Sequence, residues 1–228
     1  MLTRDRDIMI GPLNYLRKCL EVCQFRPYQW DGEDRNIGAF RSREELAAWY
    51  CQPPAPDGTP YRDRGFYTRE LAAISLAVRP RVVVEFGTSL GIGTCLLGWL
   101  NPDAALTTVD NRQDTFMPGN RVVPIGHMAQ MQGLTCDYVC GDSWDYTDEG
   151  VDLCFVDADH SYAAVVADST RAWWNRSDDG HPWAILWHDH NERHPGVVRA
   201  VAEFCGKVGV ELQSMPDSDT VWIMGDGR

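Results

Sequence analysis

Glycines recur at close spacing in the segment 82–93, which reads VVVEFGTSLGIG. An apolar, strand-like run precedes them, and an expected helix that ends near Leu100 follows. Glycines at a strand-to-helix turn let the main chain approach a ligand closely, and the helix N-terminus offers unpaired N–H groups to the same ligand. The chemistry expected here is therefore the binding of a cofactor by main-chain groups.

Two classes of cofactor site use such a turn, and the spacing of the glycines separates them. A dinucleotide-binding turn reads G-x-G-x-x-G, but Leu96 stands where the third glycine is required. The pattern E-x-G-x-x-x-G-x-G is matched at every fixed position. The candidate cofactor-contacting residues of the turn are Glu85, Gly87, Thr88, Ser89, Gly91 and Gly93.

Acidic and imidazole side chains follow two later apolar segments. Asp157 and His160 lie in DADHSY, directly after Val151–Val156, and Asp189 lies in HDHN, directly after Ala184–Trp187. In an open α/β sheet the carboxyl ends of the strands are where ligands bind. Two carboxylates from neighbouring strand ends can share a hard divalent cation, whose preferred ligands are oxygens.

Strand-like and helical segments alternate from Phe66 onward, and this alternation must position the residues above. The expected strands span 81–86, 106–109, 136–139, 151–156 and 184–187. The expected helices span 68–78, 122–132, 162–174 and 195–208, and a further helix follows the glycine turn and ends near Leu100. The segments 211–214 and 220–224 predict a closing antiparallel hairpin. The predicted fold is α/β: a seven-stranded, mostly parallel Rossmann-like sheet with helices on both faces.

The first 65 residues differ from the rest in their sequence pattern, since they mix charges, prolines and aromatic residues with little periodicity. A proline-rich loop, PPAPDGTP at 53–60, separates them from the rest. We expect an N-terminal cap at 1–65 and a catalytic domain at 66–228. The cap either forms part of an acceptor pocket or makes a homodimer contact.

The charge balance excludes several partner classes. Lys and Arg number 21 against 33 for Asp and Glu, a net charge of −12. Such a field repels nucleic acid and anionic membrane surfaces. No apolar run reaches the ~20 residues of a membrane span, and Met1–Ile10 is charged where a signal peptide is apolar. We expect a cytoplasmic protein whose eight cysteines are buried thiols.

The glycine turn resembles motif I of class I S-adenosylmethionine-dependent methyltransferases. The resemblance covers about residues 66–228 and implies S-adenosylmethionine as the cofactor. It further implies that Asp110, at the end of the second strand, accepts hydrogen bonds from the ribose diol. Asp142 and Ser143 resemble the loop that contacts the adenine, although an aspartate there is also a common turn former.

The Asp157 and Asp189 segments resemble those of divalent-metal-dependent O-methyltransferases, of the catechol and caffeoyl-coenzyme A type and of the natural-product sugar type. The resemblance implies that both aspartates bind the metal, that Asp157 also contacts the cofactor, and that His160 stands in the place of a catalytic lysine. The expected reaction is methyl transfer to a hydroxyl of a small molecule, with His160 as general base.

The third metal ligand is where the sequence departs from that pattern. Relatives with D-N or D-D at this place carry an oxygen ligand directly after the second aspartate, whereas this chain has His190 there and Asn191 one residue later. Either Asn191 completes a Mg²⁺ or Mn²⁺ site, or His190 ligates and favours Mn²⁺, Fe²⁺ or Zn²⁺, or no metal binds. The alternative functions are metal-independent methyl transfer to nitrogen or sulfur, and cofactor binding without transfer.

Overall fold

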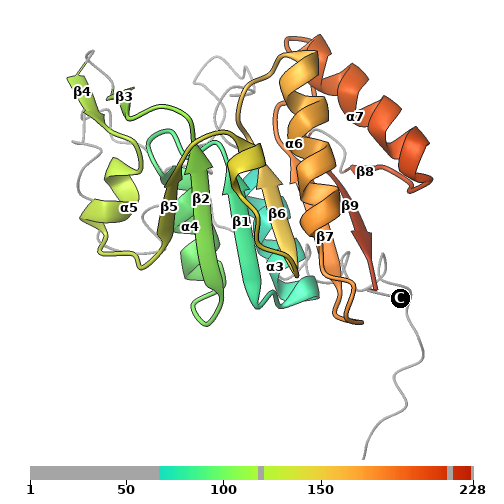
Figure 1. Ribbon diagram of the computed structural model, residues 1–228, viewed down its shortest axis with the longest axis horizontal. Coiled ribbons are helices and arrows are strands. Elements are labelled where there is room, and N and C mark those ends of the chain that lie inside the picture. The colour runs from blue at the N-terminus through green and yellow to red at the C-terminus, as the bar shows by residue number, and fades with distance from the viewer. Residues whose placement is uncertain (1–66, 118–120, 215–217, 227–228) are drawn as a thin grey trace, which may run out of the picture.

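Seven strands form one mixed sheet in the computed structural model, which describes residues 67–117, 121–214 and 218–226 (Figure 1). The strand order is β5-β2-β1-β6-β7-β9-β8. The first five strands in this order are parallel, and β9 runs antiparallel to both β7 and β8. The bounds are β1 Val82–Phe86, β2 Ala105–Asp110, β5 Asp137–Cys140, β6 Leu153–Val156, β7 Trp183–Trp187, β8 Gln213–Ser214 and β9 Val221–Gly225.

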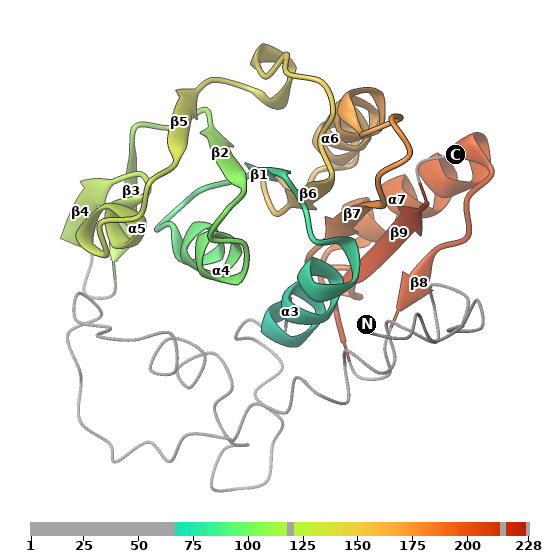
Figure 2. The same ribbon diagram turned by 90° about the horizontal axis from the view of Figure 1, so that it is seen from below.

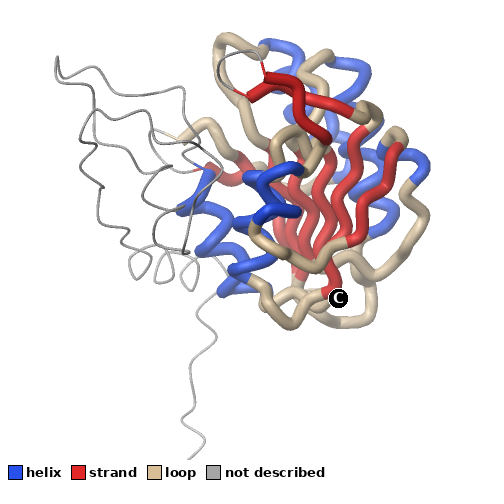
Figure 3. The backbone as a smooth tube through the Cα atoms, turned by 90° about the vertical axis from the view of Figure 1, so that its left-hand side faces the viewer, coloured by secondary structure: helices blue, strands red, loops and turns tan. Residues whose placement is uncertain are grey.

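Helices cover both faces of this sheet (Figures 2 and 3). Those on one face are α3 Tyr67–Val78, α4 Ile92–Leu100 and α5 His127–Met131, and those on the other are α6 Tyr162–Asn175 and α7 Pro195–Val208. The predicted α/β class, with its antiparallel C-terminal strands, is confirmed.

The central strands are apolar on both faces because each face packs into its own core. Along β1, Val83 joins the cluster beneath α3 and α4, whereas Val84 joins the cluster beneath α6 and α7. Along β6, Phe155 joins the cluster beneath α3 and α4, and Cys154 joins the cluster beneath α6 and α7. This two-sided burial fixes the sheet, and its carboxyl edge then presents the polar residues that follow β1, β2, β6 and β7.

The helix expected over 122–132 is wrong in its first half. An antiparallel hairpin occupies that stretch, with β3 at Asp114–Met117 and β4 at Arg121–Pro124, and only α5 is helical. The β-branched pair Val122 and Val123 favours a strand, and Pro124 lacks an N–H for a helix interior. Gly126 then takes a left-handed φ of 71°, so the helix begins only after it.

Three other expectations concern residues 1–65, the cysteines and membrane-spanning helices. Residues 1–65, with the predicted cap and its acceptor-pocket or dimer role, lie outside the described residues. The described cysteines are free thiols, but Cys140 is exposed, contrary to the expectation of burial. Within the described ranges, every helix is too short or too polar to span a bilayer.

Candidate functional site

The glycine turn after β1 owes its shape to close main-chain packing. Gly87 has φ 101° and Gly91 has φ 85°, a region that favours glycine. A Cβ at Gly87 would overlap the main-chain carbonyl of Asp157, and one at Gly91 would press on the main chain of Gly126. The turn is therefore clamped between the loop after β6 and the start of α5.

Glu85 lies beneath this turn, away from solvent. Its carboxylate accepts hydrogen bonds from the hydroxyls of Thr94 (2.5 Å) and Thr108 (2.7 Å), and the side chain of Thr88 also meets Thr108. Burial raises the pKa of Glu85 to about 8. Gly93 packs directly on the carboxylate. From this position Glu85 supports the glycine turn from below. The direct contacts of Glu85 and Thr88 with a cofactor stay predictions.

Asp110 ends β2 beside the turn, and its carboxylate is heavily hydrogen-bonded. It accepts from the main-chain N–H of Ser89 at 2.9 Å and of Arg112 at 3.0 Å. The guanidinium of Arg112 adds bonds of 3.1 and 3.2 Å. Burial alone would raise the pKa of Asp110, but these donors outweigh it and hold the pKa below its usual value. Arg112, which no sequence motif indicated, shares the carboxylate predicted to hold the ribose.

Asp142 and Ser143 lie where the chain leaves β5 and enters the short 3₁₀ helix η2, Ser143–Asp145. Asp142 accepts a hydrogen bond from Asn111 at 2.9 Å, which ties this loop to the end of β2. Its own main-chain N–H donates to Asp145 at 2.8 Å, so the turn-forming role is present. The loop stands at the same sheet edge as the glycine turn, and its adenine contact stays a prediction.

Five side chains with metal-ligating atoms meet where β6 and β7 end: Asp157, His160, His188, Asp189 and His194. His188 Nδ1 lies 3.1 Å from Asp157 and 3.5 Å from Asp189. His160 Nε2 lies 2.9 Å from Asp189 and 3.9 Å from Asp157. His194 Nε2 lies 3.8 Å from Asp189. The structure thus unites Asp157, Asp189 and His160, as their positions predicted, and adds two histidines.

Strand register explains why His188 belongs to this cluster. Val156 pairs with Trp187 across β6 and β7, so the next residues, Asp157 and His188, are lateral neighbours. The main-chain N–H of His188 donates to the carbonyl of Val156 at 3.1 Å. Asp189 then adopts a left-handed φ of 56°, which turns the chain as it leaves β7. A histidine directly before a strand-end aspartate was the only sequence signal for His188.

Of the two residues proposed as alternative third ligands, Asn191 borders the cluster. The Oδ1 of Asn191 accepts the main-chain N–H of Arg193 at 2.9 Å, and its amide donates to Asp189 at 3.4 Å. His190 belongs to neither donor group among the described residues. His188 is a further donor beside Asp157 and Asp189, and the ligand role of Asn191 stays a prediction.

The cluster is electrostatically self-compensated. Burial would raise the pKa of Asp157, yet His188 and His160 outweigh it and lower that pKa; the same balance lowers the pKa of Asp189 to about 2. Hydrogen bonds to both carboxylates raise the pKa of His160 to about 9. His160 therefore holds a proton at neutral pH while both ionised carboxylates lie beside it. Its predicted role as base requires that their charge be neutralised.

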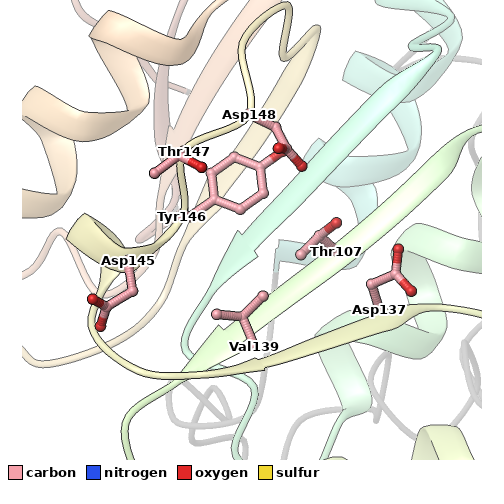
Figure 4. A pocket seen from close by; sticks show the side chains of 7 residues that line it. All are labelled: Thr107, Asp137, Val139, Asp145, Tyr146, Thr147 and Asp148. Carbon is pink, nitrogen blue, oxygen red and sulfur yellow. The ribbon is translucent and has the colours of Figure 1, made fainter.

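A small pocket opens elsewhere, over β2 and β5 (Figure 4). Its lining residues are Thr107, Asp137, Val139, Asp145, Tyr146, Thr147 and Asp148. Tyr146 closes one side and packs edge-on against Phe86 at 6.2 Å between ring centroids. The pocket shares no residue with the predicted cofactor or metal sites.

Comparisons with known proteins concern the fold and the segment that holds this site. Residues 84–190 match the family model of a methyltransferase domain, a segment that holds the glycine turn, Asp110, Asp157 and Asp189. The sequence matches no curated protein.

Among solved structures, cofactor-bound Rv0187 from MTB is similar at 17% identity, with 71% of this chain and 79% of that chain covered and a TM-score of 0.52. The methyltransferase PaMTH1 of Podospora anserina, bound to SAH, is 14% identical, with 75% of this chain and 81% of that chain covered and a TM-score of 0.52. A candidate caffeoyl-CoA O-methyltransferase of Staphylococcus aureus is 11% identical, with 69% of this chain and 81% of that chain covered and a TM-score of 0.50. At these identities the structures establish the fold. Taken together, the fold and the family match indicate a methyltransferase domain over residues 84–190, which hold the glycine turn and both aspartates.

Proposed function

We propose that the protein transfers the methyl group of S-adenosylmethionine to a hydroxyl oxygen of a small molecule, with a divalent cation beside the acceptor. The observation that carries this proposal is the packing of Gly87 on the main chain of Asp157. Through it, the turn that would hold the methyl donor and the cluster that would hold the acceptor form one continuous site.

The cofactor would lie along the carboxyl edge of β1, β2 and β5. Main-chain groups of the turn, from Gly87 to Gly91, would face its amino-acid part, and Asp110 would accept its ribose hydroxyls. Asp142 and Ser143 would border the adenine. Because Arg112 already binds Asp110, ribose binding requires the guanidinium to share or release that carboxylate. The cofactor-bound and SAH-bound similar structures support this choice of donor.

The metal would be held by Asp157, His188 and Asp189, whose ligand atoms lie within 4.8 Å of one another. Carboxylate oxygens suit Mg²⁺ and Mn²⁺, and the imidazole shifts the preference toward Mn²⁺ and its transition-metal neighbours. When bound, a divalent cation lowers the pKa of an adjacent hydroxyl. The donor set thus fits the group that the resemblance implies.

His160 would accept the proton of the acceptor hydroxyl. It is half-exposed at the rim of the cluster and within 2.9 Å of Asp189. Methyl transfer is an in-line displacement from a good leaving group, so the remaining task of the protein is alignment. The S. aureus structure, itself a candidate O-methyltransferase, supports oxygen as the acceptor atom.

The experiment is a methyl-transfer assay with catechol, phenol and sugar acceptors, together with amine and thiol acceptors. We expect transfer to a hydroxyl that excess chelator abolishes and that Mn²⁺ or Mg²⁺ restores. Asp157→Ala and Asp189→Ala should lose the restoration. Asp159→Asn, at an exposed aspartate within the same loop, is the matched control. Full activity in excess chelator would refute the metal, and transfer to amines or thiols alone would refute the acceptor.

A further inference from the structure

A second donor group lies beside the first and shares one residue with it. His160, Asp189 and His194 bring their ligand atoms within 4.8 Å of one another. The Oδ2 of Asp189 faces His160 at 2.9 Å and His188 at 3.5 Å, whereas its Oδ1 faces His194 at 3.8 Å. The Oδ2 of Asp189 therefore lies between His188 of the first group and His160 of the second, so that this one carboxylate faces both donor groups.

The fold holds His160 and His194 together through helix packing and not through chance contact of surface side chains. His194 directly precedes α7, and Gly196 lies in the first turn of that helix. A Cβ at Gly196 would overlap the carbonyl of His160 and crowd the main-chain nitrogen of Tyr162. Only glycine allows α7 to start this close to the loop that carries His160.

Side chains at the start of α6 and along α7 also join the two helices. The hydroxyl of Tyr162 donates to Glu203 at 2.5 Å, and Arg199 stacks on the Tyr162 ring at 3.8 Å. The rings of His160 and His194 consequently lie 4.3 Å apart between centroids, tilted by 49°. The two imidazoles thus lie side by side without an ion, and such a partly preformed arrangement reduces the entropic cost of binding one.

We propose that His160, Asp189 and His194 form a second metal site, selective for transition metals. Two imidazoles with one carboxylate suit Zn²⁺, Co²⁺ and Fe²⁺, whereas Mg²⁺ prefers oxygen ligands throughout. The three side chains are 37%, 20% and 31% exposed, so an ion can enter from solvent and water can complete its coordination. Pairs of ions in two-metal sites lie ~3.5–4 Å apart and commonly share a ligand.

An ion in the second site would also affect methyl transfer. This effect, unlike the site itself, rests on the proposed function. The lone pair of His160 that binds an ion is unavailable to accept a proton. An ion at His160, Asp189 and His194 would therefore inhibit methyl transfer while leaving the first cation in place. The protein would use Mg²⁺ or Mn²⁺ at low concentration and be inhibited by excess Zn²⁺.

The number of bound ions tests the site without any methyl transfer. Metal-free full-length protein is titrated with Zn²⁺ in a calorimeter and with Co²⁺ followed by visible absorption. We expect two ions per chain for the wild type, and one for His194→Asn or His160→Asn. Asp157→Asn should lose the other ion. His190→Asn, a neighbouring histidine outside both donor groups, is the matched control and should keep two.

One ion per chain in the wild type, or two in both His194→Asn and His160→Asn, would overturn the second site. Loss of an ion in His190→Asn would overturn the assignment of its ligands. Circular dichroism of each variant separates loss of the site from loss of the fold. Excess Zn²⁺ should inhibit the Mg²⁺-loaded wild type at least ~10-fold more than His194→Asn. Two ions without methyl transfer to any acceptor would refute the proposed function and leave the second site standing.

Discussion

Gly87 packs on the carbonyl group of Asp157 with no room for a side chain between them. The contact joins the turn after β1 to the loop after β6, while the main-chain N–H of Asp157 donates to the carbonyl of Phe86 at 2.8 Å. Because main-chain atoms make both contacts, the distance between the glycine turn and the Asp/His cluster is fixed by the sheet itself.

Gly87→Ala should therefore lower both stability and cofactor affinity. The added methyl group would push the turn away from Asp157, and the φ of 101° strains any residue with a Cβ. Gly150→Ala is the matched control, since its φ of 77° is also left-handed but nothing lies within 4 Å of the added Cβ. That variant should cost only ~1–2 kcal/mol of strain. Thermal unfolding and calorimetric titration of S-adenosylhomocysteine compare the two, and equal losses would refute the clamp.

Asp110→Ala should weaken S-adenosylhomocysteine binding ~10- to 100-fold, because charge-assisted hydrogen bonds to the ribose are lost. Arg112→Ala provides the contrast. It removes the guanidinium, whose two hydrogen bonds to Asp110 measure 3.1 and 3.2 Å, but keeps the carboxylate. The carboxylate oxygens are then free to accept the ribose hydroxyls. We expect its affinity to equal or exceed that of the wild type in the same titration. If both variants weaken binding equally, Arg112 itself contacts the cofactor.

Glu85 predicts a pH dependence of stability. Its folded pKa of about 8 lies above the ordinary value of 4.5, so folding favours the protonated form. This contribution is fully present below pH 4.5 and is lost as the pH rises through 8. Glu85→Gln cannot ionise, and its carbonyl can still accept the two threonine hydroxyls.

Denaturant unfolding at pH 5, 7 and 9 measures this effect. The wild type should lose stability relative to Glu85→Gln as the pH rises, by an amount on the order of a few kcal/mol. Glu149→Gln, at an exposed glutamate, should follow the wild type at every pH. A difference between Glu85→Gln and the wild type that stays constant with pH would contradict the assignment.

His160→Ala should lower the turnover number ~10²- to 10⁴-fold, the usual contribution of a general base. The rates are measured with saturating Mg²⁺, which does not favour the imidazole-rich second site. Asp159→Asn serves as control, because an asparagine oxygen can still accept the main-chain N–H of Ser161, now bound at 2.6 Å. A loss below ~10-fold in His160→Ala would mean that the cation alone activates the acceptor.

The sequence by itself determined those features that adjacent residues control. Apolar residues on both faces specified the central strands, and α7 has the predicted bounds because Pro195 suits the first helical turn and Gly209, at φ 71°, suits the end. The glycine spacing specified the turn, and strand ends placed Asp157 and Asp189. Where neighbouring residues gave conflicting signals, as at Val122 to Gly126, the helix prediction was wrong.

Only the tertiary structure decided which side chains from separate elements meet. The register of β6 against β7 puts His188 beside Asp157, and Gly196 brings α7 close enough for His194 to reach Asp189. The burial of Glu85 likewise depends on α4 lying over β1. These contacts join residues that are distant in sequence, and they depend on strand order, register and close approach of main chains. Local patterns of hydrophobicity and propensity encode none of these, because such patterns report only on each residue's neighbours along the chain.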